Sequence, residues 1–126
     1  MTKINWINNY NLLDSISAAC LEIQQALAEH LEKTANSQYK ADIEKDIVTL
    51  ENLKLIIFAV KEDVESKKVG ASTELLLRIA ANDFKNKLAQ IPEKKNLRKE
   101  IMKSLKEVHS DILHHKVRES TIQNAL

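Results

Sequence analysis

The sequence predicts an all-α protein, an antiparallel up-and-down bundle of about four long helices with coiled-coil-like packing. Apolar side chains recur at alternating steps of three and four residues along most of the chain, which is the spacing of a packed helix face. The 126 residues include one glycine and one proline, so few tight turns can form and the elements must be long. Apolar residues make up 44% and charged residues 29%, a globular balance that fits one helical domain over residues 1–126.

The first helix is expected over about residues 3–34. Its apolar face is marked by Leu13, Ile16, Cys20, Ile23 and Leu27. Trp6 and Tyr10 extend this stripe toward the amino terminus, where asparagine-rich sequence forms helix less readily and favours a late start. The two aromatic side chains either fasten the helix to the bundle or anchor a partner protein.

The second helix is expected over about residues 37–68, with Asn36 or Ser37 as its cap. Its inner side is marked by Tyr39, Ile43, Ile47, Leu50, Ile57, Val60 and Val64. Lys67 and Lys68 in the last turn complement the helix dipole, and Gly70 follows as a left-handed closing residue.

The stretch from Leu53 to Val60 has strand character, but the helical period continues on both sides and predicts helix. Its apolar residues lie almost all round the helix. This distribution indicates either a central helix or one that a second chain covers, and it makes Phe58 a candidate partner contact.

The third helix is expected over residues 72–91, with Ser72 as its cap and Pro92 as its stop. Its predicted inner face consists of Leu76, Ile79, Ala80, Phe84, Leu88 and Ile91. The fourth helix is expected over about residues 94–122, with a stripe of Leu97, Ile101, Leu105, Val108 and Ile112. Because the third helix is the shortest, its neighbours should overhang it and expose apolar surface to a protein partner or a second copy.

Charge is unevenly distributed along the chain. Residues 1–66 hold 6 lysines and 11 acidic residues, a net charge of −5, and residues 67–126 carry +6. The densest basic cluster consists of Lys94, Lys95, Arg98, Lys99, Lys103 and Lys106. The halves either neutralise one another inside the bundle, or the basic half faces an acidic partner, a lipid headgroup or a nucleic acid. No aromatic residue interrupts the cluster, so base stacking has no support there.

The composition argues against several chemistries. A single glycine cannot form a glycine-rich phosphate loop or a Gly-x-Ser-x-Gly nucleophile turn, and a single cysteine cannot form a paired-cysteine zinc site. Asp111 and His114 share a helix face, but a di-metal bundle site needs a second such motif. We therefore expect no enzyme activity, no metal and no cofactor.

The segment His30-Leu31-Glu32-Lys33-Thr34 resembles the phosphate-accepting motif of histidine phosphotransfer domains, which are also small four-helix bundles. The resemblance covers five residues and implies a phosphate-accepting His30, with Lys33 as the nearby cation. Thr34 stands where that motif has glycine, and a β-branched residue there would crowd the docking partner.

The prediction for function is a non-catalytic protein–protein interaction module, such as a subunit of a helical complex, an adaptor, a small chaperone or an immunity-type binder. Phosphotransfer through His30 and binding of lipid or nucleic acid through a basic surface are the alternatives. The candidate partner contacts are Trp6, Tyr10, Phe58, Lys94, Lys95, Arg98 and Lys99. The amino-terminal residues lack an apolar signal core and the longest apolar run is too short to span a bilayer, so a cytoplasmic or nuclear location is expected.

Overall fold

The computed structural model is a bundle of helices packed side by side. It describes the backbone of residues 5–88 and 94–125, and the side chains of residues 5–87 and 94–114. The elements are α1 (Trp6–Lys33), α2 (Ser37–Glu65), α3 (Ala71–Asp83), the π-helical segment η1 (Phe84–Leu88) and α4 (Lys95–Ala125). No strand occurs in these described ranges. The predicted all-α fold is confirmed, and the stretch from Leu53 to Val60 is helical as expected.

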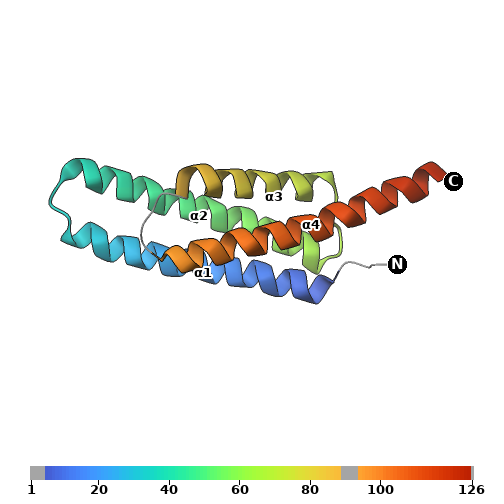
Figure 1. Cartoon of the computed structure of the whole chain (residues 1–126), viewed down its shortest axis with the longest axis horizontal. Helices are drawn as coiled ribbons and strands as arrows, with labels where there is room; N and C mark the ends of the chain where they lie inside the picture. Colours follow the sequence, from blue (N-terminus) through green and yellow to red (C-terminus); the bar gives the residue numbers. More distant parts are fainter. Residues whose placement is uncertain (1–4, 89–93, 126) are drawn as a thin grey trace.

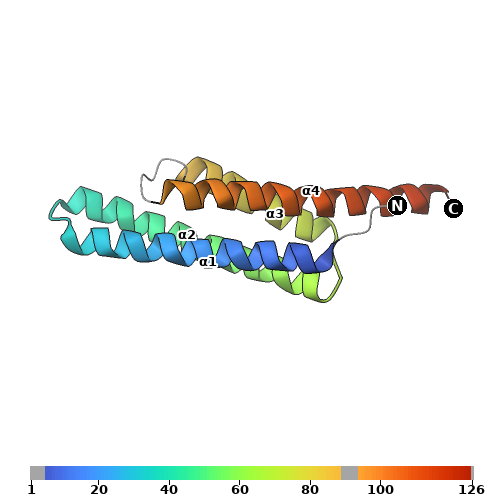
Figure 2. The ribbon, with the colours of Figure 1, turned by 60° about the horizontal axis from the view of Figure 1, so that its bottom comes forward.

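Neighbouring helices run antiparallel (Figures 1 and 2). α1 packs against α2 and α4, and α3 packs against the same two helices, so α2 and α4 lie diagonally opposite. The α1–α2 hairpin extends beyond α3 and the start of α4 at one end of the bundle, and α4 extends beyond the other helices at the opposite end (Figure 1). The third helix is the shortest of the four, as predicted, with 13 residues in α3.

The core follows the predicted apolar stripes closely in α1 and α4. In both helices the predicted inner residues are buried, apart from Leu97, which is half-buried. In the other helices, the prediction that Tyr39 and Ile79 belong to the core is wrong, because their side chains are 62% and 41% exposed. Tyr39 lies in the first turn of α2, on the protruding hairpin. Leu88 and Ile91 lie outside the described side chains.

The inner face of α3 is rotated from its predicted position. Thr73, Leu77, Ala80 and Phe84 are buried at steps of four, three and four residues. Leu75, Leu76, Leu77, Ile79, Ala80 and Ala81 surround much of the helix, so apolar spacing alone allows more than one inner face. The face that turns toward α2 is the one that carries Thr73. The Thr73 hydroxyl is buried there and donates a hydrogen bond to Asp63 Oδ2 of α2 at 2.7 Å.

The connection between α2 and α3 differs from the prediction. α2 ends at Glu65, because Lys67 adopts a left-handed conformation with φ 58°. Its N–H bonds Val64 O at 3.1 Å and the next N–H, of Lys68, bonds Asp63 O at 2.9 Å, which is a Schellman ending. Gly70, expected to be left-handed, is extended and precedes α3 instead. At the start of α2, Asn36 is the cap as predicted, since its side chain accepts from the N–H groups of Gln38 and Tyr39.

Polar side chains fix the register between helices. Gln24 of α1 donates to Ile47 O at 3.1 Å and to Glu51 Oε2 at 3.0 Å, and it accepts from Lys54 Nζ at 3.1 Å. A second tie joins α1 to α4, where Asn9 Nδ2 donates to Asp111 Oδ2 at 2.7 Å. Buried amides that need partners disfavour any sliding of one helix along the next.

Candidate interaction surfaces

An exposed apolar row runs along the outer side of α2. Val48, Leu55 and Phe58 are 57%, 62% and 58% exposed, at spacings of seven and three residues that place them on one side of the helix. The core beneath them is complete without them, because Leu50, Leu53 and Ile57 are at most 2% exposed. The row is therefore surface, and Phe58 is not part of the core.

The surroundings of Phe58 place it beside the seam between α1 and α2. Lys54, one turn before it, reaches Gln24 of α1, and Lys61, one turn after it, forms an ion pair with Asp14 of α1. Charged side chains of both signs border the row at three- or four-residue spacing from its members. They are Glu44, Glu51, Glu62, Lys45, Lys54 and Lys61. A partner that covers this row would meet apolar carbon with carboxylates and ammonium groups on its edge.

Trp6 and Tyr10 are half-buried and pack against the core. They also line an open hollow of about 390 Å³ with Val64 and Lys67 at the end of α2. Lys61 Nζ lies 4.9 Å from the centre of the Tyr10 ring, a cation–π arrangement. The two rings thus fasten α1 to the bundle while one side of each borders the hollow, and their contact with a partner stays a prediction.

The basic cluster at the start of α4 divides into two parts. Lys94 Nζ lies 3.8 Å from Glu22 Oε1 of α1, so Lys94 contributes to neutralising the acidic α1–α2 hairpin. Lys95 and Lys99 are exposed, and neither forms an ion pair with the part of the chain that the structure describes. Arg98 is half-buried in the wall of a groove. The structure therefore supports internal neutralisation at Lys94 and leaves most of the cluster facing outward.

The groove of about 360 Å³ lies between η1 and α4. It is lined by Phe84, Arg98, Lys99, Met102, Lys103 and Lys106. Phe84 is 1% exposed and forms the floor with half-buried Met102, whereas the other lining residues are cations. The sequence indicated the cations but not this floor, because the contact between Phe84 and α4 depends on the folded arrangement of α3.

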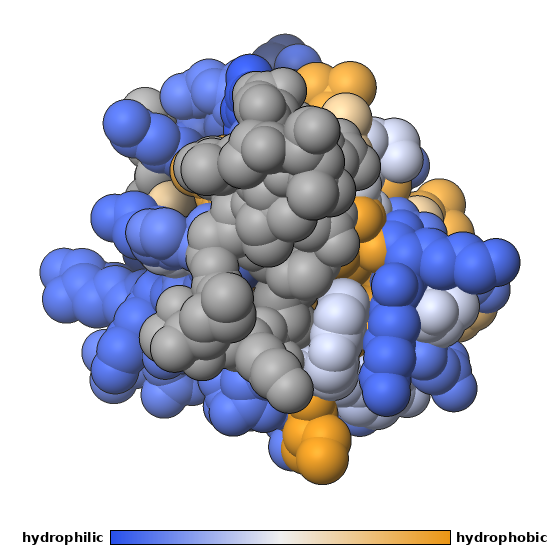
Figure 3. All heavy atoms as spheres, turned by 90° about the vertical axis from the view of Figure 1, so that its right-hand side faces the viewer, coloured by the Kyte–Doolittle hydropathy of each residue, from blue (hydrophilic) through white to orange (hydrophobic). Residues whose placement is uncertain are grey.

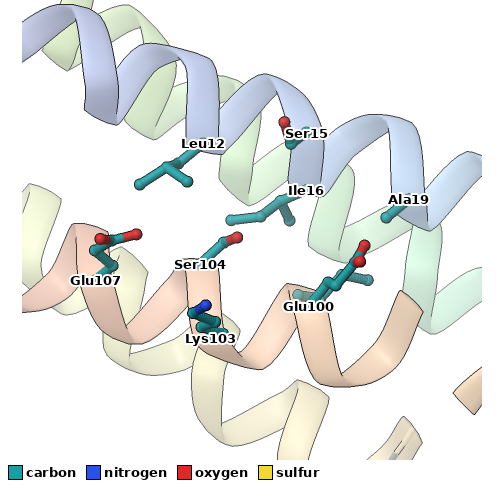
Figure 4. Close-up of a pocket in the computed structure, with 9 residues that line it drawn as sticks. Leu12, Ser15, Ile16, Ala19, Glu100, Lys103, Ser104 and Glu107 are labelled. Atoms are coloured by element: carbon teal, nitrogen blue, oxygen red, sulfur yellow. The ribbon is translucent and has the colours of Figure 1, made fainter. Parts of the chain in front are cut away.

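A second groove of about 300 Å³ lies between α1 and α4 (Figure 4). Leu12, Ile16 and Ala19 form its apolar side on α1, and Glu100, Lys103, Ser104 and Glu107 are its polar residues on α4. No histidine lines it.

Glu74, Arg78 and His109 form the most enclosed charged cluster. Glu74 is 3% exposed and accepts from Arg78 Nε at 2.7 Å and Nη2 at 3.0 Å, and His109 Nε2 lies 3.1 Å from Glu74 Oε1. Hydrogen bonds from Arg78 and His109 lower the pKa of Glu74 to about 2. Such a weak base is poorly suited to proton abstraction near neutral pH, so the geometry supports a structural tie between α3 and α4.

The remaining reactive side chains are Cys20 and His30. Cys20 is fully buried, and burial raises the pKa of its thiol to about 12, which leaves no thiolate near neutral pH. His30 and Lys33 are exposed in the last turn of α1. Phosphate transfer through His30 remains an untested alternative.

The described residues hold no group of three or more histidine, cysteine, aspartate or glutamate side chains arranged to bind a metal ion. None of the described helices combines the length and apolarity needed to cross a membrane. The end of the molecule toward which α4 extends presents apolar side chains as separate spots among hydrophilic ones (Figure 3). Comparison with protein-family models, with curated proteins and with solved structures gives no match.

Proposed function

We propose that the protein is a non-catalytic protein–protein interaction module, a subunit or adaptor of a helical complex. The observation that carries this proposal is the exposed apolar row of Val48, Leu55 and Phe58 on α2. Three large apolar side chains on one side of a helix, above a core that is already closed, are typical of a partner-binding face.

The chemistry of the row defines its occupant. An apolar centre bordered by charges of both signs fits a helix of another polypeptide that carries an apolar stripe flanked by charges of both signs. Phe58 is the expected anchor, since aromatic side chains contribute strongly at the centres of protein interfaces.

The test replaces Phe58 by aspartate and compares it with Leu75→Asp, a matched change at a 53% exposed apolar residue of α3. Both variants should keep a helical circular dichroism spectrum and unfold within about 0.5 kcal/mol of the original protein, as surface substitutions do. Ile57→Asp, a change at a fully buried neighbour, should unfold the bundle. Its circular dichroism spectrum is the reference for damage to the core.

Partners are identified by affinity purification and mass spectrometry, and binding is then reconstituted from the two purified proteins. Light scattering of the protein alone covers the case in which the partner is a second copy. We expect association to be lost in Phe58→Asp and kept in Leu75→Asp. A protein that is monomeric at high concentration, with every reconstituted partner binding Phe58→Asp as tightly as the original, would contradict the proposal.

A further inference from the structure

We propose that the groove between η1 and α4 binds an acidic amphipathic helix of a partner protein. This surface is separate from the α2 row, because α2 and α4 lie diagonally opposite in the bundle. The inference goes beyond the proposed function by assigning a second surface and the chemistry of the partner that fits it.

The first argument is the charge of the groove. Lys99, Lys103 and Lys106 form a row along about two turns of α4, and none of them has an ion-pair partner among the described residues. The acidic residue within this stretch, Glu100, lines the other groove of α4, toward α1, and Lys103 borders both grooves. Lysines at three- and four-residue spacing repel one another, and Glu100 and Glu107 stand at the same spacings from Lys103 and offset part of this repulsion. An acidic partner would relieve the part that is left on the side of the groove, which no carboxylate lines.

The second argument is the shape and chemistry of the floor. Met102 lies between Lys99 and Lys106 on α4, and Phe84 closes the groove from the side of η1. A methionine in a concave apolar site adapts to varied apolar side chains. A helix with one apolar face and carboxylates on its flanks would cover Met102 and pair with the lysines on the rim.

The third argument is the backbone beside the groove. The helix that begins as α3 changes to π-helical geometry at Phe84, the residue that forms the floor. π-helical turns are uncommon in proteins, and here the change from α to π geometry sets the position of Phe84 relative to α4. This irregularity therefore lies at the edge of the proposed binding groove.

The same features disfavour a nucleic acid or a membrane as the occupant. Phe84 is buried and offers no exposed ring for base stacking, and no other aromatic side chain lines the groove. A membrane-binding face needs apolar side chains that project between the lysines, whereas Met102 is half-buried in a concave surface.

The test uses a fluorescein-labelled synthetic peptide that forms an amphipathic helix, with leucines on one face and glutamates on its flanks. Fluorescence anisotropy measures its binding to the full chain. We expect saturable binding that weakens as salt rises, because charge pairing contributes to it. A matched peptide with glutamine in place of glutamate should bind at least about tenfold more weakly.

Two double variants with the same change in net charge separate the groove from general electrostatics. Lys99→Glu with Lys103→Glu should weaken the glutamate peptide at least about tenfold, because it reverses two rim charges. Lys40→Glu with Lys45→Glu, at two exposed lysines of α2, should leave the affinity within about twofold, because neither lysine lines the groove and α2 lies diagonally opposite α4. Met102→Gln should also weaken binding while the helical spectrum is unchanged.

Phe58→Asp should bind the peptide normally, so failure of the α2 surface and failure of this groove give different results. Equal effects of the two lysine double variants would overturn the proposal, as would equal binding of the glutamate and glutamine peptides. Tighter binding of phosphatidylserine vesicles or of a single-stranded oligonucleotide, lost in Lys99→Glu with Lys103→Glu, would assign the groove to that ligand instead. Self-association that depends on Lys99 and Lys103 and excludes the peptide would assign it to a second copy.

Discussion

Glu74 shows how a buried charge stabilises this bundle. Its carboxylate is almost fully enclosed between α3 and α4, and both of its oxygens accept hydrogen bonds from Arg78. His109 completes the cluster from α4. These donors favour the ionised carboxylate, which offsets the cost of burying it.

The pKa of Glu74 falls from 4.5 to about 2 on folding, so the ionised group stabilises the folded state above pH 4.5. This stabilisation is lost as the pH falls from 4.5 toward 2. Glu74→Gln should therefore lower the free energy of unfolding at pH 7 by about 1–3 kcal/mol, the cost of losing hydrogen bonds to a charged group. Urea denaturation at a series of pH values measures the difference, which should shrink over the same acidic range.

The matched control is Glu44→Gln, at an exposed residue of α2 with no polar partner among the described residues. Its free energy of unfolding should follow that of the original protein at every pH. If Glu74→Gln showed the same difference at pH 7 and at pH 2, the stabilising role of the ionised carboxylate would be disproved.

Burial of individual residues could be predicted from sequence only where apolar spacing was unambiguous. The stripe from Leu13 to Leu27 in α1 has polar residues between most of its members, so its inner face is clear and correct. Glu74 could not be foreseen as a buried group, since a carboxylate is normally placed on the surface. Its burial depends on a partner, His109, that lies 35 residues away in the chain.

The start of α3 depends on Thr73 and not on Ser72, which the sequence favoured as its cap. Thr73 is fully buried, and its hydroxyl accepts from the Gly70 N–H at 3.1 Å while donating to Asp63 of α2. Ser72 is exposed one residue earlier. The Thr73 hydroxyl thus gives the Gly70 N–H at the start of α3 a hydrogen-bond acceptor, and it joins this short helix to α2.

Thr73→Val, which keeps the shape and removes the hydroxyl, should lower the free energy of unfolding by about 1–3 kcal/mol, because Asp63 and the Gly70 N–H both lose a partner. Ser72→Ala is the control and should change it by less than about 0.5 kcal/mol. Urea denaturation of the two variants decides the assignment. A larger loss in Ser72→Ala than in Thr73→Val would restore Ser72 as the cap.

The lengths and order of the helices were accessible from sequence, whereas their irregular ends were not. Lys67 takes the left-handed position that glycine usually occupies, and Gly70 is extended, so the residue types misled the prediction of this connection. The π-helical segment has no distinctive residue pattern, since Phe84 and Leu88 are spaced as in an α-helix. The groove beside this segment could not be predicted from sequence either. Its floor is formed by Phe84 and Met102, which come from different elements and meet only in the folded bundle.

The two proposed surfaces lie on different helices of the bundle and differ in their chemistry. The apolar row on α2 and the basic groove beside α4 lie on different sides of the bundle, because α2 and α4 are diagonally opposite. The ion pair between Lys94 and Glu22 is one place where the acidic and basic halves of the chain meet. A module with an apolar row on one side and a basic groove on another could hold two partners of different chemistry at once, which is the arrangement expected of an adaptor.

The protruding end of the α1–α2 hairpin should be the least stable helical part of the fold. The ion pair between Lys94 and Glu22 places the start of α4 beside the middle of α1, and both figures of the fold show the hairpin continuing past it. Residues 28–33 and 37–42 include no buried side chain, whereas the middle of each helix is closed into the core. Few buried contacts permit local opening without unfolding of the bundle.

Hydrogen–deuterium exchange with mass spectrometry tests this gradient. We expect amides of residues 28–33 and 37–42 to exchange at least about tenfold faster than those of residues 13–23 and 53–64, because local opening there exposes little apolar surface. Phe58→Asp serves as the control, since it lies outside the hairpin end and should leave the gradient unchanged in the monomer. Equal protection along α1 and α2 in the isolated protein would mean that a second copy covers the hairpin end. In that case dilution should restore the fast exchange, and exchange that stayed slow at every concentration would disprove the local opening itself.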